Sequence, residues 1–207
     1  MEIMNYAQEM KNRIQGFEYG YVFTTSDFAD ISDYENRKKV LMRFANEGLI
    51  RRVRRGIYEY PKYSDFLNEY VATSPDKVAK AIARQYGWSI VPYGDTALNM
   101  LGISTQVPAV WCYISDGAYK TYKYDKVNIK FKKTTNKEIS KLSYKTALVI
   151  QALKALGKNN VDKIVISKIA SKLNKSEKEK MYNEAKYATD WIYKAIRSIC
   201  DEDVNNA

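Results

Sequence analysis

Hydrophobic residues in the first quarter of the chain recur at the three- and four-residue spacing of amphipathic helices. Residues 3–14 place their apolar side chains on one face, which predicts a first helix. Residues 25–31 predict a second helix with Thr25 as its N-cap, and residues 34–47 predict a third, longer helix after a turn. The pattern therefore indicates a small helical domain at the start of the chain.

The longest of these helices divides into an apolar and a polar face. Val40, Leu41 and Phe44 fall within one arc, and Gly48 is placed to end the helix. The opposite face carries amide and basic side chains, namely Asn36, Lys39, Arg43 and Asn46. Such a helix packs on a core with one face and presents hydrogen-bond donors with the other.

The segment LIRRVRRGIYEYP follows this helix and predicts a β-hairpin with its tip near Gly56. Apolar side chains are expected on its inner face, at Ile50, Val53, Ile57 and Tyr58, and basic ones on its outer face, at Arg51, Arg52, Arg54 and Arg55. Two packed helices followed by a basic hairpin predict a winged helix-turn-helix. In that arrangement the second helix enters the DNA major groove and the hairpin, or wing, rests on the DNA backbone.

The next part of the chain contains both helical and strand patterns. Residues 61–73 predict a linker or short helix whose aromatic side chains dock two domains. Ser74 and Pro75 open a helix that ends at Gly87, and three strands are expected between residues 110 and 132.

From residue 143 onward the pattern is helical again, and Ser176 with Glu179 predicts a capping box for a last helix that reaches about Cys200. The fold class is therefore α+β. A winged helix-turn-helix domain is expected over residues 1–62, and a mixed α/β domain that ends in helices over residues 63–207.

The charge of the chain favours a polyanionic partner. The formal net charge is +10 and the sequence pI is about 9.3, which points to nucleic acid before membrane. Six of the nine arginines lie between Arg37 and Arg55, and the planar guanidinium group pairs bidentately with phosphate or guanine. Two alternatives stay open for this cluster: a solvated charged face, and a winged helix that contacts only proteins.

The residue inventory argues against catalysis and cofactors. The chain has no histidine, its two cysteines (Cys112 and Cys200) lie far apart, and it has no glycine-rich phosphate-binding motif. We therefore expect no enzyme activity, no cofactor and no metal. No apolar run is long enough to span a membrane and no signal peptide is recognisable, so a cytoplasmic protein without a membrane partner is expected.

Four segments between residues 23 and 134 carry a family resemblance: SDFAD, RRVRRGIYEYPK, PDKVAKAIARQYGW and YGDTALNMLGISTQVPAVWCYISDG. Together they resemble the AbiEi-like antitoxins of type IV (abortive-infection) toxin–antitoxin systems, which act in phage defence. The most specific part is ALNMLGISTQVPA. The resemblance implies a bacterial repressor whose winged helix binds inverted repeats in its own promoter. It also implies an antitoxin whose following domain counteracts a nucleotidyltransferase-like toxin.

The residues expected to bind double-stranded DNA are Asn36, Arg37, Lys38, Lys39, Arg43, Arg51, Arg52, Arg54 and Arg55. Asn36, Lys39 and Arg43 are expected at base edges, and the remaining residues at phosphates. Two other functions stay open. One is a regulator without a toxin partner. The other is an RNA-binding module, suggested by eighteen tyrosines and by the basic strands around residues 120–133. The GDTALNMLGISTQVPA segment either covers a sheet or contacts a toxin.

Overall fold

The computed structural model describes residues 5–134 and 141–202, which form a mixed α+β protein, as the sequence predicts. Contacts within the chain divide it into two compact units, Met1–Trp88 (unit 1) and Ser89–Ala207 (unit 2). The boundary expected from the sequence, after residue 62, lies earlier in the chain than this division.

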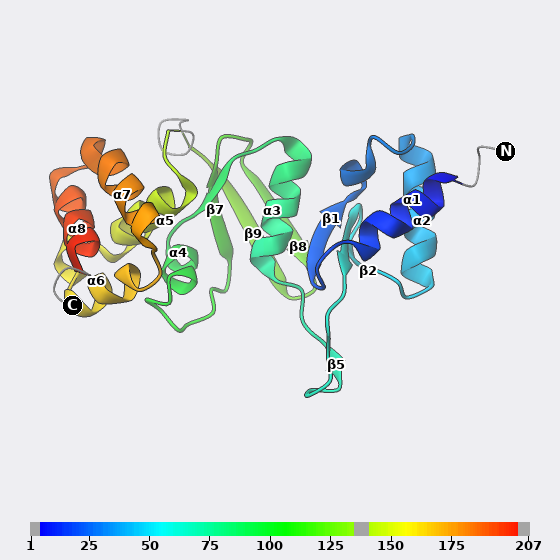
Figure 1. The fold of residues 1–207 in the computed structure, drawn as a ribbon, viewed down its shortest axis with the longest axis horizontal. Coiled ribbons are helices and arrows are strands. Elements are labelled where there is room, and N and C mark those ends of the chain that lie inside the picture. Colours follow the sequence, from blue (N-terminus) through cyan, green and yellow to red (C-terminus); the bar gives the residue numbers. More distant parts are fainter. Residues whose placement is uncertain (1–4, 135–140, 203–207) are drawn as a thin grey trace. The chain divides into compact units, whose positions relative to one another are not determined.

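Unit 1 combines helices with a three-stranded sheet. Its first elements, in chain order, are helix α1 (Asn5–Gln15), strand β1 (Tyr21–Thr24), 3-10 helix η1 (Thr25–Phe28), helix α2 (Tyr34–Asn46) and strands β2 (Arg51–Arg54) and β3 (Ile57–Tyr60). Strand β3 lies between β1 and β2, and both pairings are antiparallel (Figure 1). The hairpin expected after the long helix is therefore present.

The core of unit 1 lies between its helices and one face of this sheet. Its largest fully buried side chains are Met10, Ile14, Phe23, Phe28 and Leu41. The rings of Phe23 and Phe28 meet edge to face, with centroids 5.6 Å apart, a favourable arrangement of two aromatic quadrupoles. The apolar arc predicted for α2 faces this core, because Val40 and Phe44 are buried beside Leu41.

The short element before α2 differs from the α-helix expected over residues 25–31. It is a 3-10 helix of four residues, and its N-cap is Thr24, in an extended backbone conformation, instead of Thr25. The backbone N–H of Thr24 donates to Oδ2 of Asp27 at 2.7 Å. Because the Asp27 carboxylate turns back to Thr24, the cap lies one residue earlier than the sequence suggests.

Residues 61–73, expected to form a linker or short helix, contain a second hairpin. Strands β4 (Tyr63–Ser64) and β5 (Glu69–Tyr70) pair antiparallel and extend away from the rest of unit 1 (Figure 1). The tip carries Phe66, which is 95% exposed. Asn68 adopts a positive φ of 52° and accepts a hydrogen bond from the Tyr63 hydroxyl at 2.6 Å, which closes the turn. The aromatic side chains at this tip are therefore exposed and do not dock into a core.

Helix α3 (Pro75–Tyr86) completes unit 1, although the sequence places it in the second domain. It begins after Ser74 and ends at Gly87, whose φ is 65°, as predicted. The helix contacts β1. Arg84 donates from Nε to Oδ1 of Asp27 at 2.7 Å, from Nη2 to Oδ2 at 2.9 Å, and from Nη2 to the Val22 carbonyl at 3.1 Å. This bidentate ion pair joins α3 to η1.

The Asp27–Arg84 pair should make the stability of unit 1 depend on pH. Burial raises the pKa of Asp27, but hydrogen bonds from the Arg84 side chain and the Thr24 N–H outweigh it, so that the pKa lies below its usual value of 3.8. A carboxyl with a depressed pKa stabilises the fold above its unfolded pKa, and this contribution is lost as the pH falls through the lower folded pKa. Asp27→Asn should therefore cost about 1–2 kcal/mol at neutral pH, and less below pH 3.

Urea unfolding from pH 2 to pH 7 measures this difference. Asp65→Asn is the matched control, because it removes the same charge from the exposed hairpin tip. If Asp27→Asn and wild type differed by the same free energy at every pH, the ion pair would not be the source of the pH dependence.

Unit 2 begins with a mixed sheet. Its elements are strand β6 (Ile90–Pro92), helix α4 (Asp95–Met100) and strands β7 (Trp111–Ser115), β8 (Lys120–Tyr124) and β9 (Val127–Lys133). The strand order is β6-β7-β9-β8, with β7 and β9 parallel and the other neighbours antiparallel. The three strands expected between residues 110 and 132 are thus confirmed, with boundaries shifted by up to two residues.

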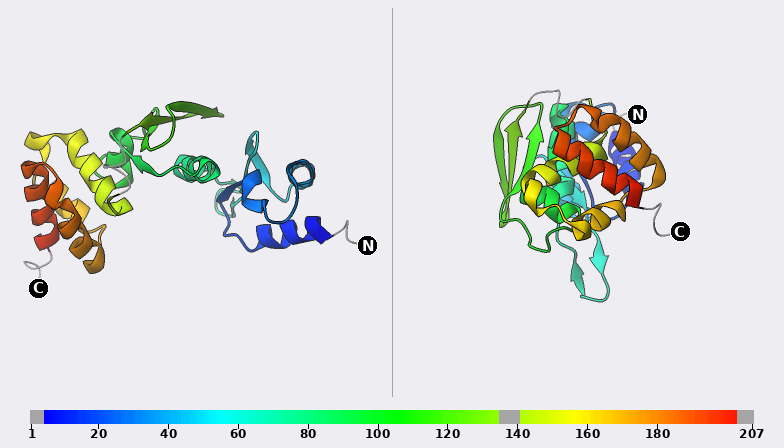
Figure 2. Two further views of the ribbon diagram at one scale, coloured as in Figure 1. Left: turned by 90° about the horizontal axis from the view of Figure 1, so that it is seen from above. Right: turned by 90° about the vertical axis from the view of Figure 1, so that its left-hand side faces the viewer.

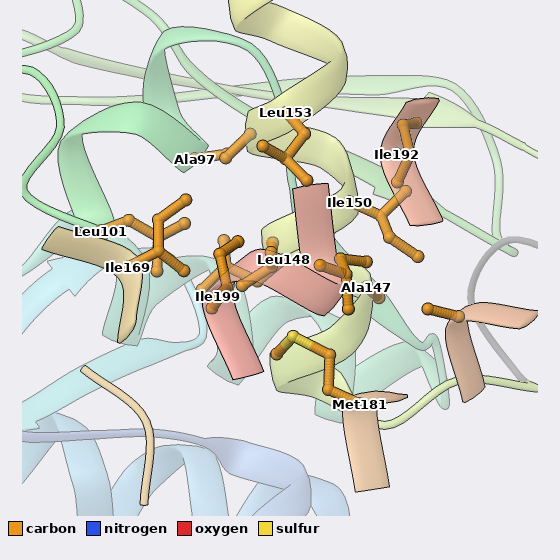
Figure 3. Packing of buried hydrophobic residues seen from close by; sticks show 14 of the residues in the cluster. Ala97, Leu101, Ala147, Leu148, Ile150, Leu153, Ile169, Met181, Ile192 and Ile199 are labelled. Carbon is orange, nitrogen blue, oxygen red and sulfur yellow. The ribbon is translucent and has the colours of Figure 1, made fainter. Parts of the chain in front are cut away.

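The remaining elements of unit 2 are helical and gather into one bundle (Figure 2). They are α5 (Tyr144–Leu156), the 3-10 helix η3 (Lys158–Asn160), α6 (Lys163–Ala170), α7 (Lys175–Glu184), the 3-10 helix η4 (Ala185–Tyr187) and α8 (Asp190–Asp201). Helix α5 is the centre of this bundle. Its side chains Ala147, Leu148 and Leu153 lie among Met181, Ile199 and other apolar residues of the neighbouring helices (Figure 3).

The last helix expected from the sequence is divided in two. Helix α7 begins after Asn174, whose side chain forms a capping box with Glu177, so the box predicted at Ser176 and Glu179 is wrong by two residues. Ala188 has an extended backbone, with ψ at 169°, which interrupts the helix before α8. Asn174 serves equally well as a cap, and the sequence pattern did not distinguish it from Ser176.

Candidate nucleic-acid interface

The outward face of α2 presents basic, amide and apolar side chains together. Lys39, Arg43 and Asn46, which the sequence placed on this face, are exposed. Met42 lies among them and is 44% exposed, although the sequence analysis did not single it out. Arg43 is held loosely, because its Nε lies 3.7 Å from Oε1 of Glu47 and both side chains are more than half exposed. Its guanidinium carbon also lies 5.5 Å from the ring centroid of Phe44, so the group is held by weak contacts that it can exchange for a ligand.

The start of α2 is occupied by contacts within the protein. Asn36, expected at a base edge, donates from Nδ2 to Oδ2 of Asp33 at 2.6 Å as part of the helix cap. Arg37 donates from Nη1 to the Thr25 carbonyl at 3.1 Å and from Nε to the Asp33 carbonyl at 3.2 Å, which braces η1 against α2. Nζ of Lys38 lies 3.5 Å from Oε2 of Glu35. A base contact by Asn36 or a phosphate contact by Arg37 would have to break these bonds.

The four arginines of the β2–β3 hairpin do not share one face. Arg52 and Arg55 are exposed and Arg54 is half-buried. A β-bulge between Arg52 and Arg54 interrupts the regular alternation that the sequence analysis assumed. Arg51, expected to face outward, turns instead to the carboxylate of Glu59 on the adjacent strand.

Arg51 and Glu59 form a network that anchors the base of the β2–β3 hairpin. Glu59 is only 3% exposed, and its Oε2 accepts from Nε of Arg51 at 3.0 Å, from Nη2 of Arg51 and from the Thr73 hydroxyl at 2.8 Å. Nη2 of Arg51 also donates to the Val71 carbonyl at 2.8 Å. Arg51 is therefore structural. An acidic residue in the apolar strand IYEY, opposite an arginine of the same hairpin, was the available sequence signal.

The residues that stay available define the basic face of unit 1: Lys39, Met42, Arg43, Asn46, Arg52 and Arg55. Asn46 at the end of α2 and Arg52 on β2 border one hollow of about 370 Å³. Arg55 lies at the turn between β2 and β3. The arrangement can place hydrogen-bond donors and an apolar side chain in a groove, with arginines at the flanking backbone.

Unit 2 carries a second basic surface on the strands for which an RNA partner was considered. Lys123 of β8 and Lys132 of β9 are exposed, and the ammonium group of Lys130 lies 5.4 Å from the ring centroid of Tyr119. Tyr119 is 59% exposed. An exposed tyrosine beside lysines is the chemistry on which single-stranded bases stack.

The GDTALNMLGISTQVPA segment of unit 2 divides into a buried and an exposed part. Thr96, Ala97 and Leu101 are buried on α4 and at its end, and the Thr96 hydroxyl accepts from the Cys112 N–H at 2.8 Å. Val107, in the loop that follows, is 77% exposed. Helix α4 thus packs on β7 and α5, and the loop that follows it is exposed at Val107.

In residues 5–134 and 141–202, no group of three or more His, Cys, Asp or Glu side chains is arranged to hold a metal ion. Among the helices of the same ranges, none has the length and apolar character that a membrane span requires. Cys112 and Cys200 are both free thiols.

Comparison with known proteins adds a family but no activity. A family model described as "Family of unknown function (DUF6088)" matches residues 9–181. No curated protein matches the chain.

Proposed function

The chain belongs to the DUF6088 family, whose function is unknown, and from its residues we propose that it is a transcriptional regulator that binds double-stranded DNA. The basic face of unit 1 carries this proposal. It combines an exposed helix that bears Lys39, Arg43 and Asn46 with a strand pair that bears Arg52 and Arg55. The element order α1-β1-η1-α2-β2-β3 and the sheet order β1-β3-β2 support a winged-helix arrangement for unit 1, in which α2 would be the recognition helix and the β2–β3 hairpin the wing.

The side chains of this face divide by the contacts they favour. Arg43 matches the O6 and N7 atoms of guanine, and Asn46 matches the N6 and N7 atoms of adenine. Met42 offers an apolar surface to a thymine methyl group, and Lys39 donates to base or phosphate. Arg52 and Arg55 lie on the strand pair and would neutralise phosphates, which contribute affinity without reading sequence.

The direct test is a titration against the DNA upstream of the protein's own gene and against a shuffled duplex, repeated across salt concentrations. The proposal expects tighter binding to the upstream DNA, with affinity for both duplexes falling steeply as salt rises. Equal, weak binding to both would leave only nonspecific electrostatic attraction and would make the basic face a candidate for protein contact.

The wing should contribute mainly to salt dependence. Each phosphate contact contributes about −0.9 to the slope of log affinity against log salt, so Arg52→Ala/Arg55→Ala should flatten the slope by about 1.8. The loss of affinity should be similar for both duplexes, because phosphates carry no sequence.

Lys163→Ala/Lys168→Ala is the control for this pair of changes, because it removes two exposed charges from α6 in unit 2. An equal flattening of the slope in this control would show that bulk charge, and not the wing, sets the salt dependence.

The resemblance to AbiEi-like antitoxins extends the proposal to autoregulation of a toxin–antitoxin operon and to protection from a nucleotidyltransferase-like toxin. Expression of the neighbouring gene with and without this protein tests the second role: the protein should restore growth. A neighbouring gene of unrelated chemistry would favour the regulator without a toxin partner.

The basic strands of unit 2 favour RNA as the competing ligand. Competition between the upstream duplex and single-stranded RNA separates the two partners. If RNA displaced the duplex at equal concentration and Lys123→Ala/Lys132→Ala weakened RNA binding, the RNA-binding function would replace the regulator.

A further inference from the structure

The hairpin of β4 and β5 concentrates exposed apolar side chains that none of the proposed DNA contacts uses. Of the fourteen large hydrophobic side chains that are exposed in the described part of the chain, five lie between Tyr63 and Val71. They are Tyr63, Phe66, Leu67, Tyr70 and Val71, and Phe66 at the tip is the most exposed of the fourteen, at 95%. Single exposed apolar residues are ordinary, but a concentration of this kind indicates an interaction surface.

The hairpin is held in shape by its own contacts. Tyr63 and Tyr70 are cross-strand partners, and their rings meet edge to face with centroids 5.3 Å apart. The Leu67 N–H donates to Oγ of Ser64 at 3.3 Å, in addition to the hydrogen bond between Tyr63 and Asn68. The tip is therefore presented on a braced turn, which reduces the conformational entropy that it would lose on binding a partner.

A hollow lies at the base of the same hairpin. It is the hollow of about 370 Å³ described above, and its apolar wall includes Ile50, Pro61 and Tyr70. Its volume is near the lower end of the range for small-molecule sites, so it has room for one large side chain. Tyr70 belongs both to this wall and to the hairpin. One continuous surface therefore runs from an apolar projection, Phe66, to an apolar hollow.

The two ends of this surface carry opposite charges. The charged residues between Tyr63 and Thr73 are both acidic, Asp65 and Glu69, and they flank the tip in a chain of net charge +10. The hollow is bordered by Arg52, whose side chain is exposed. Carboxylates beside the tip are repelled by the phosphates of nucleic acid and attracted to an arginine. The tip thus suits such a hollow and not DNA.

We propose that two copies of this chain associate by exchanging these hairpins, so that Phe66 of each copy enters the hollow of the other. The hairpin extends away from the rest of unit 1, so its tip does not reach the hollow of its own chain (Figure 1). A surface with a projection at one end and a matching hollow at the other is self-complementary about a two-fold axis, because each contact then occurs twice.

The exchange brings Asp65 and Glu69 of one copy close to Arg52 of the other, and it covers the exposed aromatic side chains of both hairpins. The interface is small, which suits a dissociation constant in roughly the micromolar range. It forms without DNA, since no nucleic acid takes part in these contacts.

Sedimentation equilibrium of the full-length protein tests the proposal, and DNA is left out because Arg52 also belongs to the basic face. Between about 1 and 200 µM the wild type should pass from monomer to dimer. Phe66→Ser should raise the dissociation constant of the dimer about tenfold or more. Thermal unfolding should hardly change in this variant, because the side chain is exposed.

Ile164→Ser is the matched control, because it changes another exposed apolar side chain, on α6 in unit 2, and should leave the dimer unchanged. A wild type that stays monomeric throughout this concentration range would overturn the proposal. So would a dimer whose dissociation constant is the same in Phe66→Ser as in the wild type.

Reversal of the charges tests the pairing of tip and hollow directly. Asp65→Lys/Glu69→Lys makes both the tip and the border of the hollow basic, and Arg52→Glu makes both acidic, so each variant alone should stay monomeric. An equimolar mixture of the two should form a mixed dimer, because basic tips then meet acidic hollows and acidic tips meet basic ones. A mixture that stays monomeric, or a dimer of wild-type affinity in either variant alone, would refute the exchange.

Discussion

Replacing Arg43 with alanine should remove most of the preference for the upstream DNA over a shuffled duplex. A bidentate contact between arginine and guanine is worth about 1–3 kcal/mol of discrimination, or roughly a 5- to 150-fold difference in affinity. Arg43 is the exposed arginine of α2, and its only ion pair there, with Glu47 at 3.7 Å, is solvent-exposed on both sides and contributes little. The loss should appear as a collapse of the ratio between the two dissociation constants.

Arg43→Lys is the matched variant for this prediction. Lysine keeps the positive charge but lacks the planar fork of donors, so it should retain nonspecific affinity and lose the preference. Thermal unfolding should hardly change in either variant, because exposed surface substitutions away from special contacts usually stay within about 0.5 kcal/mol. Full preference in Arg43→Lys would mean that Arg43 acts only as a charge, and the base-reading residue would have to be sought at Lys39 or Asn46.

The sequence was informative where one local rule decides the structure. The arc of Val40, Leu41 and Phe44 follows from helical periodicity alone, and the structure buries all three. Gly87 ends α3 with a positive φ, a conformation that glycine adopts at little cost. Ser74 and Pro75 likewise mark the start of that helix correctly.

The sequence was less informative about whether a charged side chain is exposed to solvent or bonded to a residue far away in the sequence. Arg37 and Arg51 belong to the same cluster as Arg52 and Arg55, but the first two bond to Thr25 and to Glu59. The alternation of apolar and polar residues along a strand predicts which face of the sheet a side chain occupies, but not its hydrogen-bond partner. In β2 the β-bulge interrupts this alternation, so even the face is not predicted correctly. The Asp27–Arg84 pair spans 57 positions, beyond the reach of any local pattern.

The hairpin of β4 and β5 shows a further limit of pattern reading. Its strands are two residues long, so alternation has no length over which to appear, and its aromatic residues resembled core residues. Whether these aromatic side chains are exposed depends on the direction in which the chain leaves strand β3. The composition of the segment does not determine that direction.

Arg51→Ala should destabilise unit 1 more than any other change in the arginine cluster. The substitution leaves the carboxylate of Glu59 buried without its cation, and breaking a buried ion pair in this way typically costs about 3–5 kcal/mol. The Thr73 hydroxyl, at 2.8 Å, is a weaker substitute. For a domain of this size the melting temperature should fall by at least about 10 °C.

The two partners should not be equivalent. The Arg51 side chain is 34% exposed, whereas that of Glu59 is 4% exposed. After Glu59→Ala the guanidinium group can still reach water and the Val71 carbonyl, so this variant should be less destabilised than Arg51→Ala. In the double variant Arg51→Ala/Glu59→Gln the buried group is neutral, so part of the stability lost in Arg51→Ala should return.

Stability and DNA binding can then be measured on the same proteins, well below the lowest melting temperature. Because Arg51 serves the fold and not the phosphates, folded Arg51→Ala/Glu59→Gln should keep the salt slope of the wild type, in contrast to Arg52→Ala/Arg55→Ala. A flattened slope with unchanged stability would reverse the assignment and return Arg51 to the DNA-contacting surface. An unchanged slope in Arg51→Ala/Glu59→Gln, together with a large loss of stability in Arg51→Ala, would support the assignment of Arg51 to the fold and not to a DNA contact.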